Sequence, residues 1–322
     1  MTHSIHHVGR RPAKFLTGSL CLGLLLALVC LGVIPQSAYS ADKDKSQQIS
    51  RVIAKEMTAA QKALQAGQWA EAIKNLAAVV RASDGVMVAR GDLGVEMGYA
   101  ELAGLQKQII LEARHQNRVV IMATQMMESM ITNTIPTRAE VSDVANAVMD
   151  GTDAVMLSAE TASGRHPTKV VEAMSQIIVG AEKYQVAHVR IKQRKSGYFE
   201  HTDEAIAAAV MYAANHLHVK AIVALTESGS TSLWMSRVRS DIPIYAFTRH
   251  QATRCRVTLY RGVYPVAYDV TDKGEAFYFS IFRLLLDLKL VDEGDSIILT
   301  KGELSGVSGG TNSMQILHVV RK

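Results

Sequence analysis

The strongest constraint on the fold is a repeat of about 35 residues, in which a short apolar run is followed by a helical pattern. The apolar runs cover residues 85–89, 119–123 and 154–157, and hydrophobic residues follow one another in them instead of alternating with polar ones. Such runs are typical of parallel strands that are buried on both faces of a sheet and connected by helices. The repeat therefore predicts three β/α units of a (β/α)8 barrel.

The residues that follow the first two predicted strands can bind a phosphate beside a metal ion. Gly91 and Asp92 follow the first strand, and Thr124 follows the second. In a parallel barrel the carboxyl ends of the strands form the active site. Backbone N–H groups, a carboxylate and a hydroxyl suit a phosphate and a divalent cation. Each feature taken singly is also compatible with an ordinary polar turn.

Longer segments around these residues resemble the pyruvate kinase family, and the resemblance extends from about Ser83 to Lys322. The segments are Met87–Glu96, Ala123–Met130, Pro136–Ala147 and Asp150–Thr161. The resemblance implies phosphoryl transfer in glycolysis, from phosphoenolpyruvate to ADP, with Mg2+ and K+ as cofactors. It further implies a homotetramer, Asp92 and Thr124 as catalytic residues, Asp92 as the metal ligand, and Gly91, Asp92 and Thr124 as the site of the substrate phosphate.

Residues 186–322 resemble the C-terminal α/β domain of the same family. The predicted strands are 221–225, 242–247, 263–267, 296–299 and 314–319, with helices at 203–216 and 275–288. The first strand leads into a loop of hydroxyl and backbone groups that can form an anion nest, namely Thr226, Ser228, Gly229, Ser230 and Thr231. In the family this loop holds the phosphate of an effector, which implies a sugar phosphate or a nucleotide. An ordinary polar turn is the alternative.

The first forty residues have the pattern of a targeting segment. Arg10, Arg11 and Lys14 precede an apolar stretch at residues 15–34, and Ala38-Tyr39-Ser40 offers small side chains for cleavage before residue 41. This pattern predicts a cleaved signal peptide at residues 1–40, with an uncleaved membrane anchor as the alternative. The resemblance implies a cytoplasmic protein, whereas this segment predicts export or anchoring in the inner membrane.

Charge and cysteine content exclude two classes of function. The formal net charge is +5, of which the three basic residues of the targeting segment supply +3, so no basic stripe for nucleic acid is expected. Two of the three cysteines lie in the apolar stretch, and Cys255 stands alone in the rest of the chain. An intrachain disulfide beyond the targeting segment and a cysteine metal site are therefore not expected.

Residues 41–82 predict a helical hairpin. Ile49, Val52, Ile53 and Met57 recur at helical spacing, and a break at residues 65–68 separates them from a second helical pattern. Residues 63–73 resemble the turn region of a tetratricopeptide repeat, of which a single copy is visible. The hairpin is interpreted either as a protein-binding arm or as a support that packs on the following domain.

The chain also departs from the family pattern. Only the last three β/α units are matched, over residues 83–185, the lid domain and the K+ ligands are missing, and no Lys-x-Glu motif precedes Ser83. The sequence therefore predicts a partial barrel that is loosely packed or self-associating, and a single chain that is truncated and inactive. The alternative function is a non-catalytic effector-binding or fusion protein with an exported helical arm.

Overall fold

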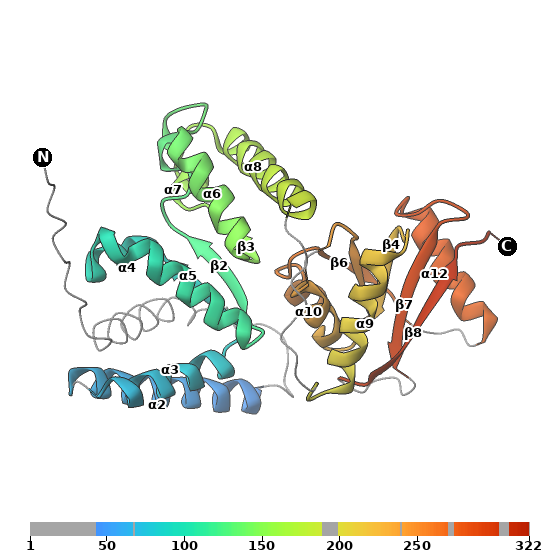
Figure 1. Cartoon of the computed structure of the whole chain (residues 1–322), viewed down its shortest axis with the longest axis horizontal. Helices are drawn as coiled ribbons and strands as arrows, with labels where there is room; N and C mark the ends of the chain where they lie inside the picture. Colours follow the sequence, from blue (N-terminus) through green and yellow to red (C-terminus); the bar gives the residue numbers. More distant parts are fainter. Residues whose placement is uncertain are drawn as a thin grey trace, which may run out of the picture. The chain divides into compact units, whose positions relative to one another are not determined.

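The computed structural model describes residues 43–66, 68–188, 199–238, 240–269, 274–302 and 309–321. The predicted signal segment at residues 1–40 lies outside these ranges. The chain divides into two compact units, residues 1–174 and residues 175–322 (Figure 1). Among the described residues, no helix combines the length and the apolar character that crossing a membrane requires.

The described part of the N-terminal unit starts with two helices, α2 (Lys43–Gln65) and α3 (Trp69–Ala82), which lie side by side (Figure 1). Small side chains form the contact, since Ala60, Ala63 and Ala72 are at most 5% exposed. Close approach of the two helices needs small side chains at these positions. The interpretation of residues 41–82 as a hairpin domain, and its likeness to a tetratricopeptide repeat, remain predictions.

A three-stranded parallel sheet follows, in the order β1 (Gly85–Ala89), β2 (Val119–Ala123) and β3 (Ala154–Val155). The first two strands begin and end where the apolar runs predict, and the third is two residues long, shorter than the predicted 154–157. The helices of this part are α5 (Tyr99–His115), η1 (Glu128–Ile131), α6 (Arg138–Asp150) and α7 (Ala159–Ala162), and α8 (Pro167–His188) extends past residue 174, the boundary between the units. The arrangement is that of consecutive β/α units.

The apolar faces of these strands are better covered than the sequence suggested. The sequence predicts a loosely packed or self-associating partial barrel, yet Val86, Val88, Val120 and Met122 are 0% exposed. The expectation is wrong for these four residues because α5 packs on both β1 and β2 and buries Leu105, Ile109 and Ile110. Val155 and Leu157 are only half-buried.

The segment after β1 is a helix, α4 (Arg90–Met97), where the sequence suggested a turn. The chain leaves β1 through Ala89, which is still extended, and enters the helix directly at Arg90. Gly98 ends the helix with φ 83°, a backbone conformation that glycine adopts without steric cost. As a result, Gly91 and Asp92 lie in the first turn of a helix and not in an irregular loop.

The C-terminal unit contains a five-stranded sheet in the order β6-β5-β4-β7-β8, in which only β8 is antiparallel to its neighbour. The strands are β4 (Ala221–Leu225), β5 (Ile244–Thr248), β6 (Val263–Ala267), β7 (Ser296–Gly302) and β8 (Thr311–His318). The helices are α9 (Thr202–His216), α10 (Ser230–Ser236), α11 (Gln251–Val257) and α12 (Glu275–Asp287). Helix α12 buries Phe277, Ile281, Phe282 and Leu285 against the sheet, and this contact forms the main core of the unit.

Candidate functional site

Two of the predicted site residues, Gly91 and Thr124, are in direct contact. The backbone N–H of Gly91 donates a hydrogen bond of 2.9 Å to Thr124 Oγ1. The contact follows from the register of the sheet, because Ala89 of β1 is paired with Ala123 of β2, so the residues after both strands start from the same edge. Gly91 and Thr124 are 33 residues apart in the sequence, and the parallel pairing of β1 with β2 brings them together.

Asp92, the third predicted residue, is exposed and lies in the first turn of α4. The first-turn N–H groups of a helix lack intrahelical partners, and the helix dipole makes this end favourable for anions. A phosphate beside Gly91 and Asp92 would therefore meet N–H donors as well as a cation held by the carboxylate. Asp92 itself, as an acidic residue in the first turn, also interacts favourably with the dipole.

The donor set fits Mg2+ only together with a phosphate ligand. Within the described ranges, no three His, Cys, Asp or Glu side chains cluster so that they could hold a metal ion. Mg2+ is commonly held by one or two carboxylates, with water and substrate phosphates completing the coordination. Asp92 can supply such a carboxylate. For K+ the sequence offers no predicted ligand, so we assign no K+ site.

The turn after β2 has a strained backbone. Thr124 has φ 64° and Gln125 has φ 52°, although neither is glycine. Residues with side chains pay about 1–2 kcal/mol for this conformation and retain it only where the surroundings hold it. The strain directs Thr124 Oγ1 toward the first turn of α4, so the surroundings of this turn are part of the site.

Arg90 holds this strained turn, a role that the sequence analysis missed. Its side chain is almost completely buried, with 6% exposed surface. The guanidinium donates to the carbonyl oxygen of Thr124 from Nη2 (2.7 Å) and Nε (3.3 Å), and Nη2 also donates to the carbonyl oxygen of Gln125 at 3.0 Å. Its Nη1 forms an ion pair with Asp143 of α6. Nothing in the local pattern indicates these partners, because all lie more than thirty residues away.

Glu160 connects the turns that follow β2 and β3. The side chain is 3% exposed, and its two carboxylate oxygens accept hydrogen bonds from the backbone N–H groups of Met127 (3.1 Å) and Ser158 (2.7 Å). A buried carboxylate needs such partners, since an unpaired one costs several kcal/mol. The residue pattern does not predict this role, although Glu160 lies within a segment that resembles the family.

Glu140 fixes the loop between β2 and α6. Together with Thr137 it forms a capping box at the start of α6, and it also accepts hydrogen bonds from the N–H (2.7 Å) and the hydroxyl (2.5 Å) of Ser129. Burial raises the pKa of Glu140, but the hydrogen bonds from Ser129 and Thr137 outweigh this effect and lower the pKa below its ordinary value.

The predicted anion nest lies between β4 and α10. Gly229 adopts φ 87°, and its N–H donates to Thr226 Oγ1 at 2.8 Å. Thr231, which is 1% exposed, shares a hydrogen bond of 2.7 Å with Thr311 of β8. The hydroxyls of Thr226 and Thr231 thus stabilise the loop through hydrogen bonds inside the protein. Among the predicted nest residues, Ser228 and Ser230 are half-buried, so their side chains are partly exposed at the surface.

Charged residues of the loop that follows β5 stabilise the nest. Glu227 contacts the imidazole Nε2 of His250 and forms an ion pair with Arg249 over 3.5 Å, and its backbone carbonyl accepts a hydrogen bond of 2.6 Å from Thr253. Because β4 and β5 are parallel neighbours, the loops that follow them meet at one edge of the sheet. The residue pattern of the loop predicts the nest but not this support.

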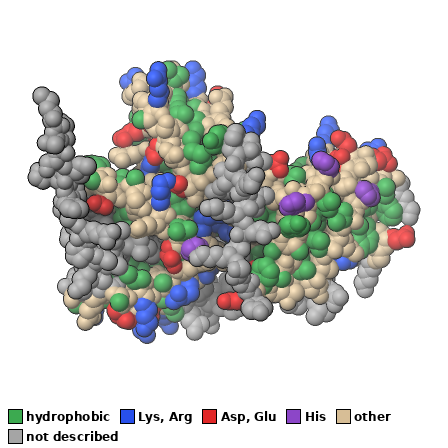
Figure 2. Space-filling model, viewed as in Figure 1, with side chains coloured by type: hydrophobic (Ala, Val, Ile, Leu, Met, Phe, Trp, Pro, Cys, Tyr) green, Lys and Arg blue, Asp and Glu red, His purple; other side chains and the backbone are tan. Residues whose placement is uncertain are grey.

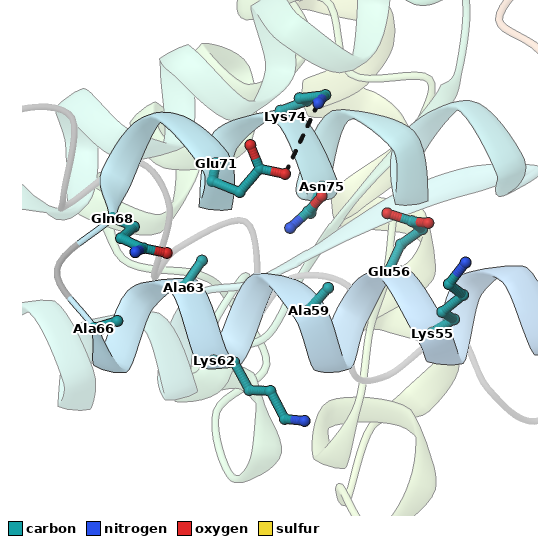
Figure 3. A pocket seen from close by; sticks show the side chains of 10 residues that line it. All are labelled: Lys55, Glu56, Ala59, Lys62, Ala63, Ala66, Gln68, Glu71, Lys74 and Asn75. Atoms are coloured by element: carbon teal, nitrogen blue, oxygen red, sulfur yellow. Dashed lines mark ion pairs between the residues drawn. The ribbon is translucent and has the colours of Figure 1, made fainter.

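A shallow furrow of about 700 Å³ lies between α2 and α3, apart from the residues described above. Figure 3 shows Asn75 directed into the gap between the helices, Lys62 directed away from it, and the ion pair between Glu71 and Lys74 beside it. Basic and acidic side chains lie next to one another on the face of this hairpin that Figure 2 shows. The side chains that line the furrow therefore do not create an electrostatic potential of a single sign for a charged ligand.

Two family models match separate parts of the chain. Residues 40–171 match the model of the pyruvate kinase barrel domain, and residues 204–317 match that of the pyruvate kinase alpha/beta domain. The first match includes α2 and α3, so it begins well before Ser83, where the sequence analysis placed the start of the resemblance.

Curated relatives and a solved structure extend this result. Pyruvate kinase II of Salmonella typhimurium is 53% identical over 75% of this chain and 50% of its own length, and pyruvate kinase of Buchnera aphidicola subsp. Baizongia pistaciae is 50% identical over 78% and 53%. A crystal structure of a pyruvate kinase from Cryptosporidium parvum superimposes with a TM-score of 0.68 at 33% identity, over 77% of this chain and 50% of that one. The chain therefore belongs to the pyruvate kinase family and spans about half the length of the relatives that it matches.

Proposed function

We propose that the chain binds the phosphate of phosphoenolpyruvate together with a divalent cation at Gly91, Asp92 and Thr124. The observation that carries the proposal is the hydrogen bond between the Gly91 N–H and Thr124 Oγ1, which joins the ends of two parallel strands beside an exposed carboxylate. Phosphate oxygens accept from the first-turn N–H groups of α4 other than that of Gly91, which donates to Thr124, and Thr124 supplies a hydroxyl. A Mg2+ ion bound here would neutralise the charge of the phosphate.

We further propose that the single chain does not complete the transfer to ADP. Phosphoryl transfer depends on cations and donors placed around the transferring group. The segment before β1 folds as α3 and contains no Lys-x-Glu motif, which is the basis for this inference. The fold proposed for this part is a partial barrel of three β/α units behind a helical hairpin, with residues 1–40 as a signal peptide or anchor.

A second candidate function is effector binding without catalysis. The braced loop from Thr226 to Thr231 favours it, because Gly229 and the half-buried Ser228 and Ser230 offer groups suited to a phosphate. A sugar phosphate or a nucleoside monophosphate is the ligand class that we infer for this loop. Association into a tetramer, as the family resemblance implies, is compatible with either function.

Electron paramagnetic resonance of Mn2+ tests the binding proposal on the full chain, with Mn2+ as the spectroscopic substitute for Mg2+. The signal of free Mn2+ should fall when protein and phosphoenolpyruvate are both present. Asp92→Asn should abolish this fall. Glu101→Gln, which removes an exposed carboxylate in the first turn of the next helix, should leave it unchanged. An equal response of both variants would contradict the assignment of Asp92.

A coupled assay of ATP formation tests the second part of the proposal. With phosphoenolpyruvate, ADP, Mg2+ and K+ present, the wild-type chain should form no ATP above background. Turnover that disappears in Asp92→Ala would show that the chain is a working kinase, and the proposed inactivity would then be wrong.

A further inference from the structure

Three polar groups meet at the carboxyl end of β7, outside the sites described above. Lys301 Nζ lies 3.0 Å from the hydroxyl oxygen of Tyr278 on α12, and that hydroxyl donates a hydrogen bond of 3.0 Å to Gln315 Oε1 on β8. The ammonium group also lies 5.1 Å from the ring centroid of Tyr278 and 5.2 Å from that of Phe277. The phenol oxygen of Tyr278 thus has a cation and an amide as immediate neighbours.

The alternation of side chains along β7 explains why this group forms here. Ile297 and Leu299 point into the core under α12, and Lys301, two residues further on, lies on the same face of the sheet. At this point the core ends, so the lysine stem covers apolar surface while its ammonium group reaches the phenol. Ser313 of β8 donates a hydrogen bond of 3.0 Å to the carbonyl oxygen of Lys301 and fixes the backbone.

The electrostatics of Tyr278 differ from those of another tyrosine in the same unit. The hydrogen bond from Lys301 lowers the pKa of Tyr278, and the Gln315 amide lowers it further, whereas burial works in the opposite direction. The Gln315 side chain can turn its NH2 group toward a phenolate oxygen. By contrast, burial raises the pKa of Tyr245, and the nearby Tyr264 adds to this effect.

We propose that Tyr278 is a reactive phenol and a site of covalent modification by electrophiles that transfer a sulfonyl or acyl group, activated by Lys301. Tyr278 is half-buried, so a small electrophile can reach its oxygen. The proton of the phenol passes to solvent, and the adjacent ammonium group stabilises the phenolate that remains. With an aryl sulfonyl fluoride the phenolate oxygen attacks sulfur, an O–S bond forms, the S–F bond breaks, and fluoride leaves with the electron pair.

Site-resolved mass spectrometry after brief treatment of the full chain with an aryl sulfonyl fluoride at mildly alkaline pH tests the proposal. Tyr264, whose side chain is 55% exposed, serves as the reference in the same molecule. Tyr278 should be labelled several-fold faster than Tyr264. Equal or slower labelling of Tyr278 in the wild-type chain would overturn the proposal.

Variants of Lys301 assign the cause of the reactivity. Lys301→Gln should bring the labelling rate of Tyr278 down toward that of Tyr264, and Lys301→Arg, which keeps the charge, should restore most of it. Lys289→Gln, at an exposed lysine just beyond α12, should change neither rate. Unchanged labelling of Tyr278 in Lys301→Gln with an intact circular dichroism spectrum would contradict the proposal. If Lys301→Gln unfolds the unit, Gln315→Leu is used in its place. Gln315→Leu should slow the labelling of Tyr278 and leave the labelling rate of Tyr264 unchanged. An unchanged ratio of the two labelling rates would again overturn the proposal.

Discussion

Arg90 donates a hydrogen bond of 2.7 Å to the carbonyl oxygen of Thr124, and this bond holds a strained turn beside the candidate phosphate site. The guanidinium is buried and also contacts Gln125 and Asp143. Charge-assisted hydrogen bonds of this kind are about twice as strong as neutral ones. The position of Thr124 Oγ1 therefore depends on Arg90, the residue that follows the neighbouring strand β1.

Replacement of Arg90 by Met should release this turn. The change leaves two backbone carbonyls and Asp143 without their partner, and the expected loss of stability is about 1–3 kcal/mol. Hydrogen exchange measured by mass spectrometry should become faster for residues 124–131. The control is Arg114→Met, which also removes an arginine that donates to a carbonyl, that of Gly151, at 2.7 Å. Exchange at residues 124–131 that is the same in Arg90→Met as in the wild-type chain would contradict this role.

Glu140 should make the stability of the N-terminal unit depend on pH in the acid range. Because its pKa is lower in the folded chain than in the unfolded chain, its contribution is present in full above the unfolded value of about 4.5. The contribution is lost as the pH falls through the folded pKa. The difference in unfolding free energy between wild type and Glu140→Gln should therefore shrink as the pH falls, in urea titrations. A difference that stays constant with pH would exclude proton linkage at Glu140.

Substitution of Gly229 and of Gly262, both in the C-terminal unit, provides a matched pair of variants that tests the geometry of the nest. Both have positive φ, 87° at Gly229 and 71° at Gly262. A Cβ atom at Gly229 would lie 2.8 Å from Val257 Cγ1, whereas a Cβ at Gly262 would meet nothing within 4 Å. Thermal melting should show Gly229→Ala to be more destabilised than Gly262→Ala, whose cost is limited to about 1–2 kcal/mol of backbone strain. Equal melting temperatures would show that the loop adapts to the extra methyl group.

A phosphate-bearing effector should raise the melting temperature of the wild-type chain. A ligand present at about 100 times its Kd stabilises the native state by about 2.7 kcal/mol. Sugar phosphates and nucleoside monophosphates are the compounds to titrate, and Ser228→Ala combined with Ser230→Ala should reduce the shift. No shift with any of these compounds on a folded sample would leave the loop with a structural role alone.

Local patterns in the sequence predicted several strands well and singled out Gly91 and Thr124, which the structure brings into contact, but they did not predict helix α4. The runs at 85–89, 119–123 and 221–225 are continuous apolar segments, and they form strands over the same residues. Helix α4 was missed because its two glycines disfavour a helix by about 1 kcal/mol each. Its contacts with β1 and α5 and the hydrogen bond from Gly91 to Thr124 support it in the folded chain.

The supporting residues were missed for a different reason. Arg90 and Glu160 bind groups that lie more than thirty residues away in the sequence, and only the parallel pairing of β1, β2 and β3 brings them together. Residue type and local spacing carry no information about such partners. Likewise, the burial of Val86 and Val88 depends on the packing of the unit and not on their own strand.

Isothermal titration of the full chain with phosphoenolpyruvate, with and without Mg2+, tests the central claim most directly. We predict saturable binding that requires Mg2+, is lost in Asp92→Asn, is weakened in Arg90→Met, and persists in Glu101→Gln. Absence of binding by a folded wild-type sample, or binding that is equally strong without Mg2+ and in Asp92→Asn, would contradict the assignment of Gly91, Asp92 and Thr124 as a site for phosphate and a divalent cation.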